Sequence, residues 1–120
     1  MNFELKYDGD QDIIRGRVHG TLDAAVAKAV AGEVAQLVQN HGCHRFLIDL
    51  RGTQVTSSTI EIYSIPRVVK EVGVPGGLKR ALVVTEITPD FDFLETTSVN
   101  VGNQVKLFTD PEAAIAWLKG

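Results

Sequence analysis

The spacing of apolar residues changes abruptly at Gly20, and this change constrains the fold more than any other feature of the chain. Before Gly20, apolar and polar residues alternate with a period of two, as in a half-buried β-strand. After Gly20, apolar residues recur every three or four positions, as on one face of an α-helix. Strand-like and helix-like stretches then alternate as far as Leu118. The sequence therefore predicts an α/β fold.

Two strands are predicted before Gly20. The first spans residues 3–7, the second spans residues 13–19, and a polar turn near residues 8–11 separates them. Two such strands with a short turn between them favour an antiparallel hairpin. In the second strand, alternation places two sets of side chains on opposite faces: Ile14, Gly16 and Val18 on one, and Arg15, Arg17 and His19 on the other.

The first helix is predicted to begin at Thr21, a residue type that caps helices, and to end at Gly42. Gly32 lies inside this helix, where we expect it to allow close approach to the sheet. Short apolar runs then predict three further strands, each followed or preceded by a helical stripe. These strands cover approximately residues 44–50, 80–85 and 104–108.

The remaining helices carry recognisable start signals. Ser58 and Glu61 fit a capping box that opens the second of them. Pro66 lies within its stripe and either kinks one helix or begins a new one, and we favour one kinked helix over residues 58–72. A helix near residues 89–101 has poor intrinsic propensity and must be held by packing, and the last helix begins at Asp110.

Strands that alternate with helices imply parallel pairing. We therefore expect residues 1–120 to form a single domain, with an N-terminal antiparallel hairpin followed by β-α repeats. These repeats form a mostly parallel mixed sheet packed by about four helices. The first strand is expected at an edge of the sheet.

Composition excludes several classes of function. The chain has 120 residues and a net charge of −3, and its 12 Lys and Arg residues are scattered, which argues against nucleic acid as a partner. No apolar stretch approaches the ~20 residues that span a bilayer, so we expect no stable membrane insertion. One cysteine, Cys43, and a start without a signal-peptide pattern favour a cytoplasmic protein.

No residue pattern predicts catalysis, a metal site or a cofactor. His41, Cys43 and His44 offer three metal ligands at most, whereas zinc sites need about four on a defined frame. Aspartates near the first turn lack the rest of a calcium-loop pattern. We therefore expect a protein that is not an enzyme and that holds neither a metal nor a cofactor.

Residues 46–58, with the sequence FLIDLRGTQVTSS, resemble the STAS/SpoIIAA-like family. Residues 79–84 and 105–118 are similar to an uncharacterised branch of that family, which is related to anti-sigma factor antagonists and to Sec14-type domains. The resemblance implies a SpoIIAA-like fold and a non-enzymatic regulatory or protein-interaction module. Partner switching is one mode of action that the resemblance implies for such a module.

In the antagonists, a partner kinase phosphorylates one serine of this motif. The resemblance thus makes Ser57 and Ser58 candidate regulatory phosphoacceptors. This chain has Thr56 and Thr59 where the antagonist pattern has Asp and Gly. The other interpretation is structural: Ser58 caps a helix and Ser57 belongs to a loop. A phosphate at a helix start would in either case meet free N–H groups and a favourable dipole.

Two functional hypotheses follow. In the first, the loop over residues 51–58 and the helix after it contact a protein partner, and the edge strand also makes a homodimer plausible. In the second, a groove between helices 58–72 and 89–101 binds a small apolar or lipid-like ligand. A helix cannot bury Phe91 and Phe93 equally, because they lie about 200° apart around its axis. The candidate ligand or partner face comprises Ile62, Pro66, Phe91, Phe93 and Leu94.

Overall fold

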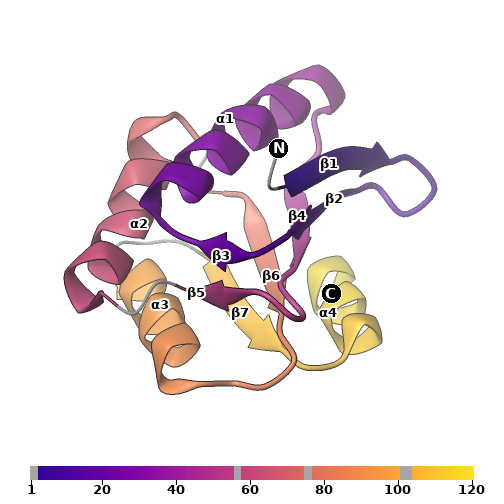
Figure 1. Ribbon diagram of the computed structural model, residues 1–120. Coiled ribbons are helices and arrows are strands. Elements are labelled where there is room, and N and C mark those ends of the chain that lie inside the picture. Colours follow the sequence, from indigo (N-terminus) through magenta and orange to yellow (C-terminus); the bar gives the residue numbers. More distant parts are fainter. Residues whose placement is uncertain (1–2, 56–57, 75–76, 101–103) are drawn as a thin grey trace.

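A five-stranded sheet runs through the middle of the molecule, in the order β1-β2-β4-β6-β7 (Figure 1). The computed structural model describes residues 3–55, 58–74, 77–100 and 104–120. β1 is antiparallel to β2 and lies at an edge, and all other neighbours in this sheet are parallel. The strands are β1 Phe3–Asp8, β2 Ile13–Val18, β4 Arg45–Asp49, β6 Lys79–Val83 and β7 Gln104–Phe108. The predicted α/β fold with an N-terminal hairpin is confirmed.

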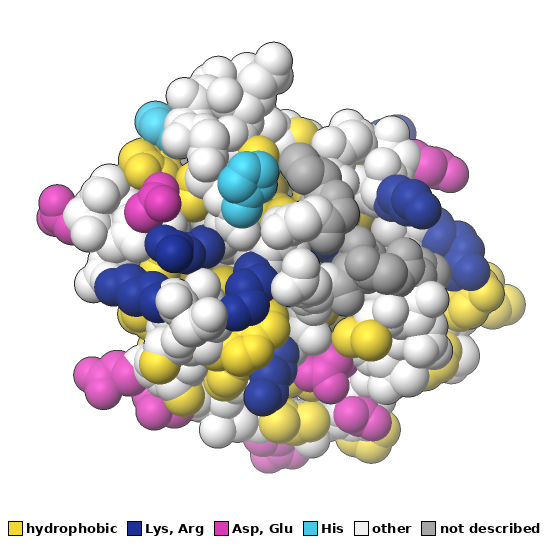
Figure 2. Space-filling model, turned by 180° about the vertical axis from the view of Figure 1, so that it is seen from behind, with side chains coloured by type: hydrophobic (Ala, Val, Ile, Leu, Met, Phe, Trp, Pro, Cys, Tyr) yellow, Lys and Arg dark blue, Asp and Glu magenta, His cyan; other side chains and the backbone are white. Residues whose placement is uncertain are grey.

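Helices cover both faces of the sheet, but unequally. α1 (Ala24–His41), α2 (Thr59–Glu71) and α3 (Pro89–Asn100) pack on one face, and α4 (Pro111–Lys119) packs on the other (Figure 1). None of the helices in the described ranges is both long and apolar enough to cross a membrane. Basic side chains that are scattered along the sequence gather in space, and Figure 2 shows one such group on the rear face of the molecule.

The alternation of side chains along the strands produces two hydrophobic cores. Ile14 and its neighbours on one face of the sheet join the larger core, beneath α1, α2 and α3. Ile13 points to the other face and joins a smaller core beneath α4. That smaller core comprises Ile13, Leu47, Ala81, Val83, Ala114 and Leu118. The predicted separation of Ile14 and Gly16 from Arg15 and Arg17 on β2 follows the same alternation.

The start of α1 differs from the prediction. Thr21 does not cap the helix, because Thr21–Leu22 forms a short strand, β3, that pairs in parallel with β5 (Gln54–Val55). Asp23 is the cap instead, and its carboxylate accepts a hydrogen bond from the Val26 N–H at 2.9 Å. The helix ends as predicted at Gly42, which adopts the left-handed conformation with φ 62°.

Two further predictions about the helices have clear outcomes. Gly32 is exposed and does not approach the sheet, since a methyl group there would have Val72 at 3.9 Å as its nearest neighbour. α2 is a single helix that contains Pro66, as predicted. Thr88 caps α3 through a hydrogen bond from Phe91 N–H to its hydroxyl at 3.3 Å, and Asp110 caps α4.

The hairpin turn and the end of α1 meet around Cys43, whose side chain is fully buried. Its thiol lies 3.3 Å from the carbonyl oxygen of Asp12, a turn residue with φ 55°. Tyr7 stacks on His41 beside it, with 4.0 Å between the ring centroids. Burial raises the pKa of the Cys43 thiol. The thiol thus acts as a small buried side chain between the hairpin turn and the start of β4.

Candidate functional site

Ser58 caps α2, as the capping box predicted. Its backbone is extended, and its hydroxyl accepts a hydrogen bond from the Glu61 N–H at 3.3 Å. The Ser58 side chain is exposed. A phosphate on this hydroxyl would therefore reach solvent while it lay beside the N-terminus of α2. Ser57, the other candidate phosphoacceptor, lies outside the described residues.

Glu61 connects the start of α2 to the start of α1. Its carboxylate oxygen Oε1 accepts a hydrogen bond from the Ala24 N–H at 2.9 Å, across 37 positions of sequence. This N–H belongs to the first residue of α1, where helix donors have no partner within the helix. The orientation of the α2 N-terminus is therefore coupled to α1 by a charge-assisted hydrogen bond.

Two large apolar side chains on the first turns of α2 face solvent. Ile60 is 83% exposed and Tyr63, one turn further along, is 50% exposed. The guanidinium of Arg67 lies over the Tyr63 ring at 4.1 Å from its centroid and donates to the Tyr63 hydroxyl at 2.7 Å. We call Ser58, Ile60, Tyr63 and Arg67 the α2 surface. It combines an exposed aliphatic side chain, an aromatic ring and a positive charge beside a hydroxyl.

The α2 surface was only partly accessible to sequence reasoning. The prediction placed a contact surface on this helix but did not single out Ile60 or Tyr63. The available signal was the apolar stripe of α2, in which Ile62 and Ile65 occupy the buried positions. Ile60 and Tyr63 lie off that stripe, and apolar residues outside a helix's buried face are candidates for contact with a partner.

The five residues predicted as a ligand or partner face lie mostly inside the protein. Ile62, Pro66, Phe91 and Leu94 are buried between α2, α3 and the sheet. Phe93 is partly exposed and packs against the same core, so only one of the two phenylalanines is fully buried, as expected. A side chain buried in this way does not meet a partner at the surface, which leaves the ligand interpretation for this set.

An apolar cavity of about 90 Å³ lies in the larger core. Residues of α1, α2, α3 and the sheet line it, and Pro66 and Leu94 are among them. Pockets that hold drug-sized ligands measure roughly 300–1,000 Å³. The cavity therefore has room for only a few atoms unless α2 and α3 move apart.

Arg80 and Ser98 bring polar atoms to the lining of this cavity. Arg80 belongs to β6 and is 8% exposed, which is unusual for a guanidinium. Desolvation by burial lowers the pKa of Arg80 to about 10, so the side chain still carries a positive charge at neutral pH. The interior thus holds a cation at the wall of an apolar space.

The predicted absence of a metal site concerned His41, Cys43 and His44. In the structure, His41 stacks on Tyr7, the Cys43 thiol is buried, and His44 is exposed. Within the described ranges, no group of three or more His, Cys, Asp and Glu side chains is placed to hold a metal ion.

Comparison with known proteins assigns this chain to no family. No protein-family model matches the chain, and no curated protein matches it.

Proposed function

We propose that this protein is a non-enzymatic regulatory module that binds a protein partner through the α2 surface. The observation that carries the proposal is the exposure of Ile60 and Tyr63 on the first turns of α2. Aromatic and Arg side chains are enriched where proteins meet, and the Arg67 guanidinium already lies over the Tyr63 ring and donates to its hydroxyl. A side chain ordered before binding loses less entropy when a partner arrives.

The resemblance to the STAS/SpoIIAA-like family supports the same surface. The residues that carry it, FLIDLRGTQVTSS over positions 46–58, lead directly into α2. The partner is a protein whose contact region is apolar and bears a carboxylate, because Ile60 and Tyr63 offer apolar area and Arg67 offers a cation.

Ser58 gives this surface a means of regulation. A phosphate there would add roughly two negative charges beside Ile60 and within the first turn of α2. The N-terminus of the helix stabilises that charge, whereas an acidic partner would be repelled by it. Phosphorylation of Ser58 is therefore expected to weaken partner binding without unfolding the domain.

The test compares variants in an affinity capture from extract of the organism that makes the protein. Ile60→Asp places a charge on the α2 surface, and Val99→Asp places one on α3 instead, at an apolar residue that is 50% exposed. We expect wild type and Val99→Asp to capture the same set of proteins. Ile60→Asp is expected to lose that set. Capture that is the same for all three proteins contradicts the proposal.

The switch is tested with a pair of substitutions that both retain a helix cap. Ser58→Asp and Ser58→Asn cap α2 equally well, and they differ only in charge. Binding of the captured partner is expected to fall with Ser58→Asp and to persist with Ser58→Asn. Equal affinity of both variants for the partner contradicts regulation at this residue.

A second function is favoured by one observation, the apolar cavity beside Arg80. A small apolar ligand with a carboxylate would place its chain among Pro66 and Leu94 and its charge near Arg80. Because the cavity measures only about 90 Å³, such a ligand must separate α2 from α3. Native mass spectrometry of freshly purified protein tests this function. A clean mass of the free protein, with no displacement of a bound dye by fatty acids, contradicts it.

A further inference from the structure

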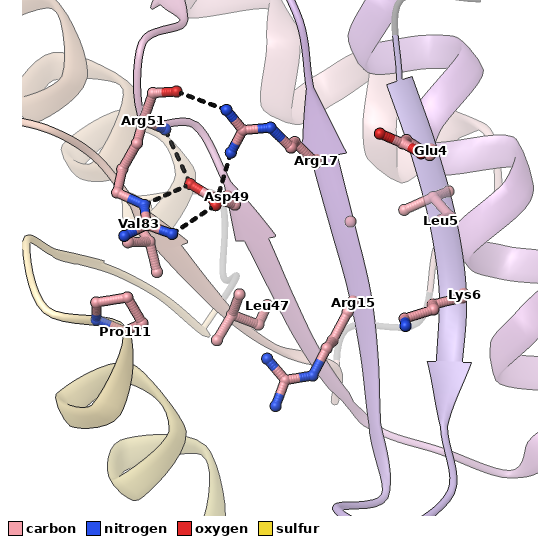
Figure 3. A pocket seen from close by; sticks show the side chains of 11 residues that line it. Glu4, Leu5, Lys6, Arg15, Arg17, Leu47, Asp49, Arg51, Val83 and Pro111 are labelled. Atoms are coloured by element: carbon pink, nitrogen blue, oxygen red, sulfur yellow. Dashed lines mark hydrogen bonds and ion pairs between the residues drawn. The ribbon is translucent and has the colours of Figure 1, made fainter.

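A second hollow lies on the opposite face of the sheet, next to α4 (Figure 3). α4 packs on β4, β6 and β7, and the hollow opens beside it over β1 and β2. Its volume is about 380 Å³, which falls within the range of small-molecule sites. Four basic side chains line it, Lys6, Arg15, Arg17 and Arg51, against two carboxylates, Glu4 and Asp49.

The register of the hairpin places two of these cations against each other. Lys6 lies directly opposite Arg15 in the antiparallel pair of β1 and β2. Like charges at directly opposed positions destabilise a sheet. On the other side of Arg15, β4 places Leu47 and not a carboxylate. The sheet therefore concentrates positive charge at this point, and neither residue directly opposite Arg15 carries a counter-charge.

The carboxylates around these two cations only partly offset them. Asp8 accepts a hydrogen bond from Arg15 Nε at 3.0 Å, which leaves the two terminal nitrogens of the guanidinium for other acceptors. Lys6 forms no ion pair with any residue that the structure describes. A guanidinium edge beside an ammonium group is the arrangement that binds phosphate oxygens, through hydrogen bonds and charge together.

The other end of the hollow is already paired. Asp49 is shared by two guanidinium groups: its Oδ2 lies 2.7 Å from Arg17 Nη1 and 2.9 Å from Arg51 Nη2 (Figure 3). Glu4 faces Arg17 in the register but lies 2.9 Å from His19. An incoming anion thus meets its least satisfied cations at Lys6 and Arg15. Beyond them, the apolar floor is formed by Leu47 and the partly exposed Pro111, over the fully buried Val83.

We propose that this hollow binds a small phosphate monoester, with the phosphate between Lys6 and Arg15 and an apolar body over Leu47. The charge surplus selects the phosphate, and the apolar floor selects an ester over free inorganic phosphate. The site lies on the face of the sheet opposite to α1, α2 and α3, so it is independent of the α2 surface.

The test is a titration of the ¹⁵N-labelled protein at constant ionic strength, with inorganic phosphate, phenyl phosphate and phenol as probes. The amide signals of Gly16 and Leu47 are expected to shift with phenyl phosphate, and less with phosphate at the same concentration. Phenol alone is expected to give no saturable shift. If phenyl phosphate binds no more tightly than inorganic phosphate, the apolar floor has no role in binding. The hollow then holds an adventitious ion only, which contradicts the proposal.

Variants locate the site. Lys6→Gln combined with Arg15→Gln is expected to weaken phenyl phosphate binding about tenfold or more. Lys28→Gln removes an exposed cation from α1 and is the matched control, with unchanged affinity expected. Asp49→Asn removes a lining carboxylate and is expected to tighten binding. Equal affinities of wild type and of the Lys6/Arg15 double variant overturn the proposal, and the dispersion of the amide spectrum shows that each variant is folded.

Discussion

Gly16 and Gly32 illustrate how differently one residue type acts at two positions. A methyl group on Gly16 would lie 2.5 Å from Leu5 Cδ2 and 3.2 Å from Phe46 Cε1, so the absent side chain makes room for the core. A methyl group on Gly32 would contact only Val72, at an ordinary 3.9 Å. The first glycine is required by packing, and the second only lowers the stability of α1.

Opposite effects of alanine follow for these two positions. Gly16→Ala is expected to lower the free energy of unfolding by about 1–3 kcal/mol, because Leu5 and Phe46 must shift. Gly32→Ala is expected to raise it by about 0.5–1 kcal/mol through better helix propensity. Urea denaturation of both variants measures the difference. A loss of stability in Gly32→Ala would show that α1 needs the glycine for another reason.

Asp49 links stability to pH. The hydrogen bond from Arg51, strengthened by the charges of Arg51 and Arg17, holds the pKa of this carboxyl below its ordinary value. Because the pKa is lower in the folded than in the unfolded protein, ionised Asp49 stabilises the fold at pH values above its unfolded pKa of about 4. This stabilisation is lost as the pH falls through the pKa of the folded protein.

Asp49→Asn is therefore expected to lower the free energy of unfolding by about 1 kcal/mol at pH 7. The figure is small because both guanidinium groups are about half exposed and solvent screens them. The gap between variant and wild type is expected to close below about pH 4. Denaturant titrations at pH 7 and pH 3 measure it, and a gap that is equal at both values excludes the ionised carboxylate as its cause.

Among the secondary-structure elements, those with a clear apolar period were predictable and the shortest were not. The hairpin, α2 with its cap at Ser58, and α4 with its cap at Asp110 follow from local patterns. The pairing of β3 with β5 does not, because two-residue strands carry no period and their partners lie 33 positions apart. That pairing takes Thr21 away from α1 and moves the helix start to Asp23.

The edge strand β7 is protected by a side chain from α3. Glu95 Oε2 accepts a hydrogen bond from the backbone N–H of Leu107 at 2.7 Å, at the end of the sheet order. An open N–H on an edge strand is a template for pairing with another chain. The carboxylate occupies that donor within the molecule.

Glu95→Ala is expected to destabilise the protein by about 1 kcal/mol and to promote self-association at high concentration. Glu95→Gln keeps an acceptor oxygen and is expected to remain close to wild type on both counts. Thermal denaturation and sedimentation velocity measure the two effects. If the alanine variant matches wild type in both, the Glu95 hydrogen bond does not protect the edge.

At the scale of the whole molecule, the two cores share one sheet, and this arrangement predicts a single unfolding transition. Trp117, the only tryptophan in the sequence, belongs to α4 and packs on Phe108 of β7, with the ring centroids 5.7 Å apart. Its fluorescence reports on the smaller core, whereas far-UV circular dichroism reports mainly on α1, α2 and α3. Coincident urea midpoints are expected from both probes. Separate midpoints would show that α4 and the smaller core unfold on their own.

The sites were less accessible to prediction than the fold, because each depends on pairing across long stretches of sequence. The sequence placed Arg15 and Arg17 on one side of β2, but only the hairpin register sets Lys6 opposite Arg15. Apolar spacing identified α2, yet which of its apolar side chains remain in solvent depends on how α1 and α3 pack against it.

Alkylation of the buried Cys43 thiol reports rare opening of the structure around it. An alkylating reagent reaches this sulfur only when the hairpin turn at Asp12 separates from the end of α1, because the side chain has no exposed surface when they are closed. The rate of alkylation in the native state, followed by mass spectrometry, therefore measures how often the hairpin turn and the end of α1 separate. No reporter group has to be introduced, since the chain carries a single cysteine.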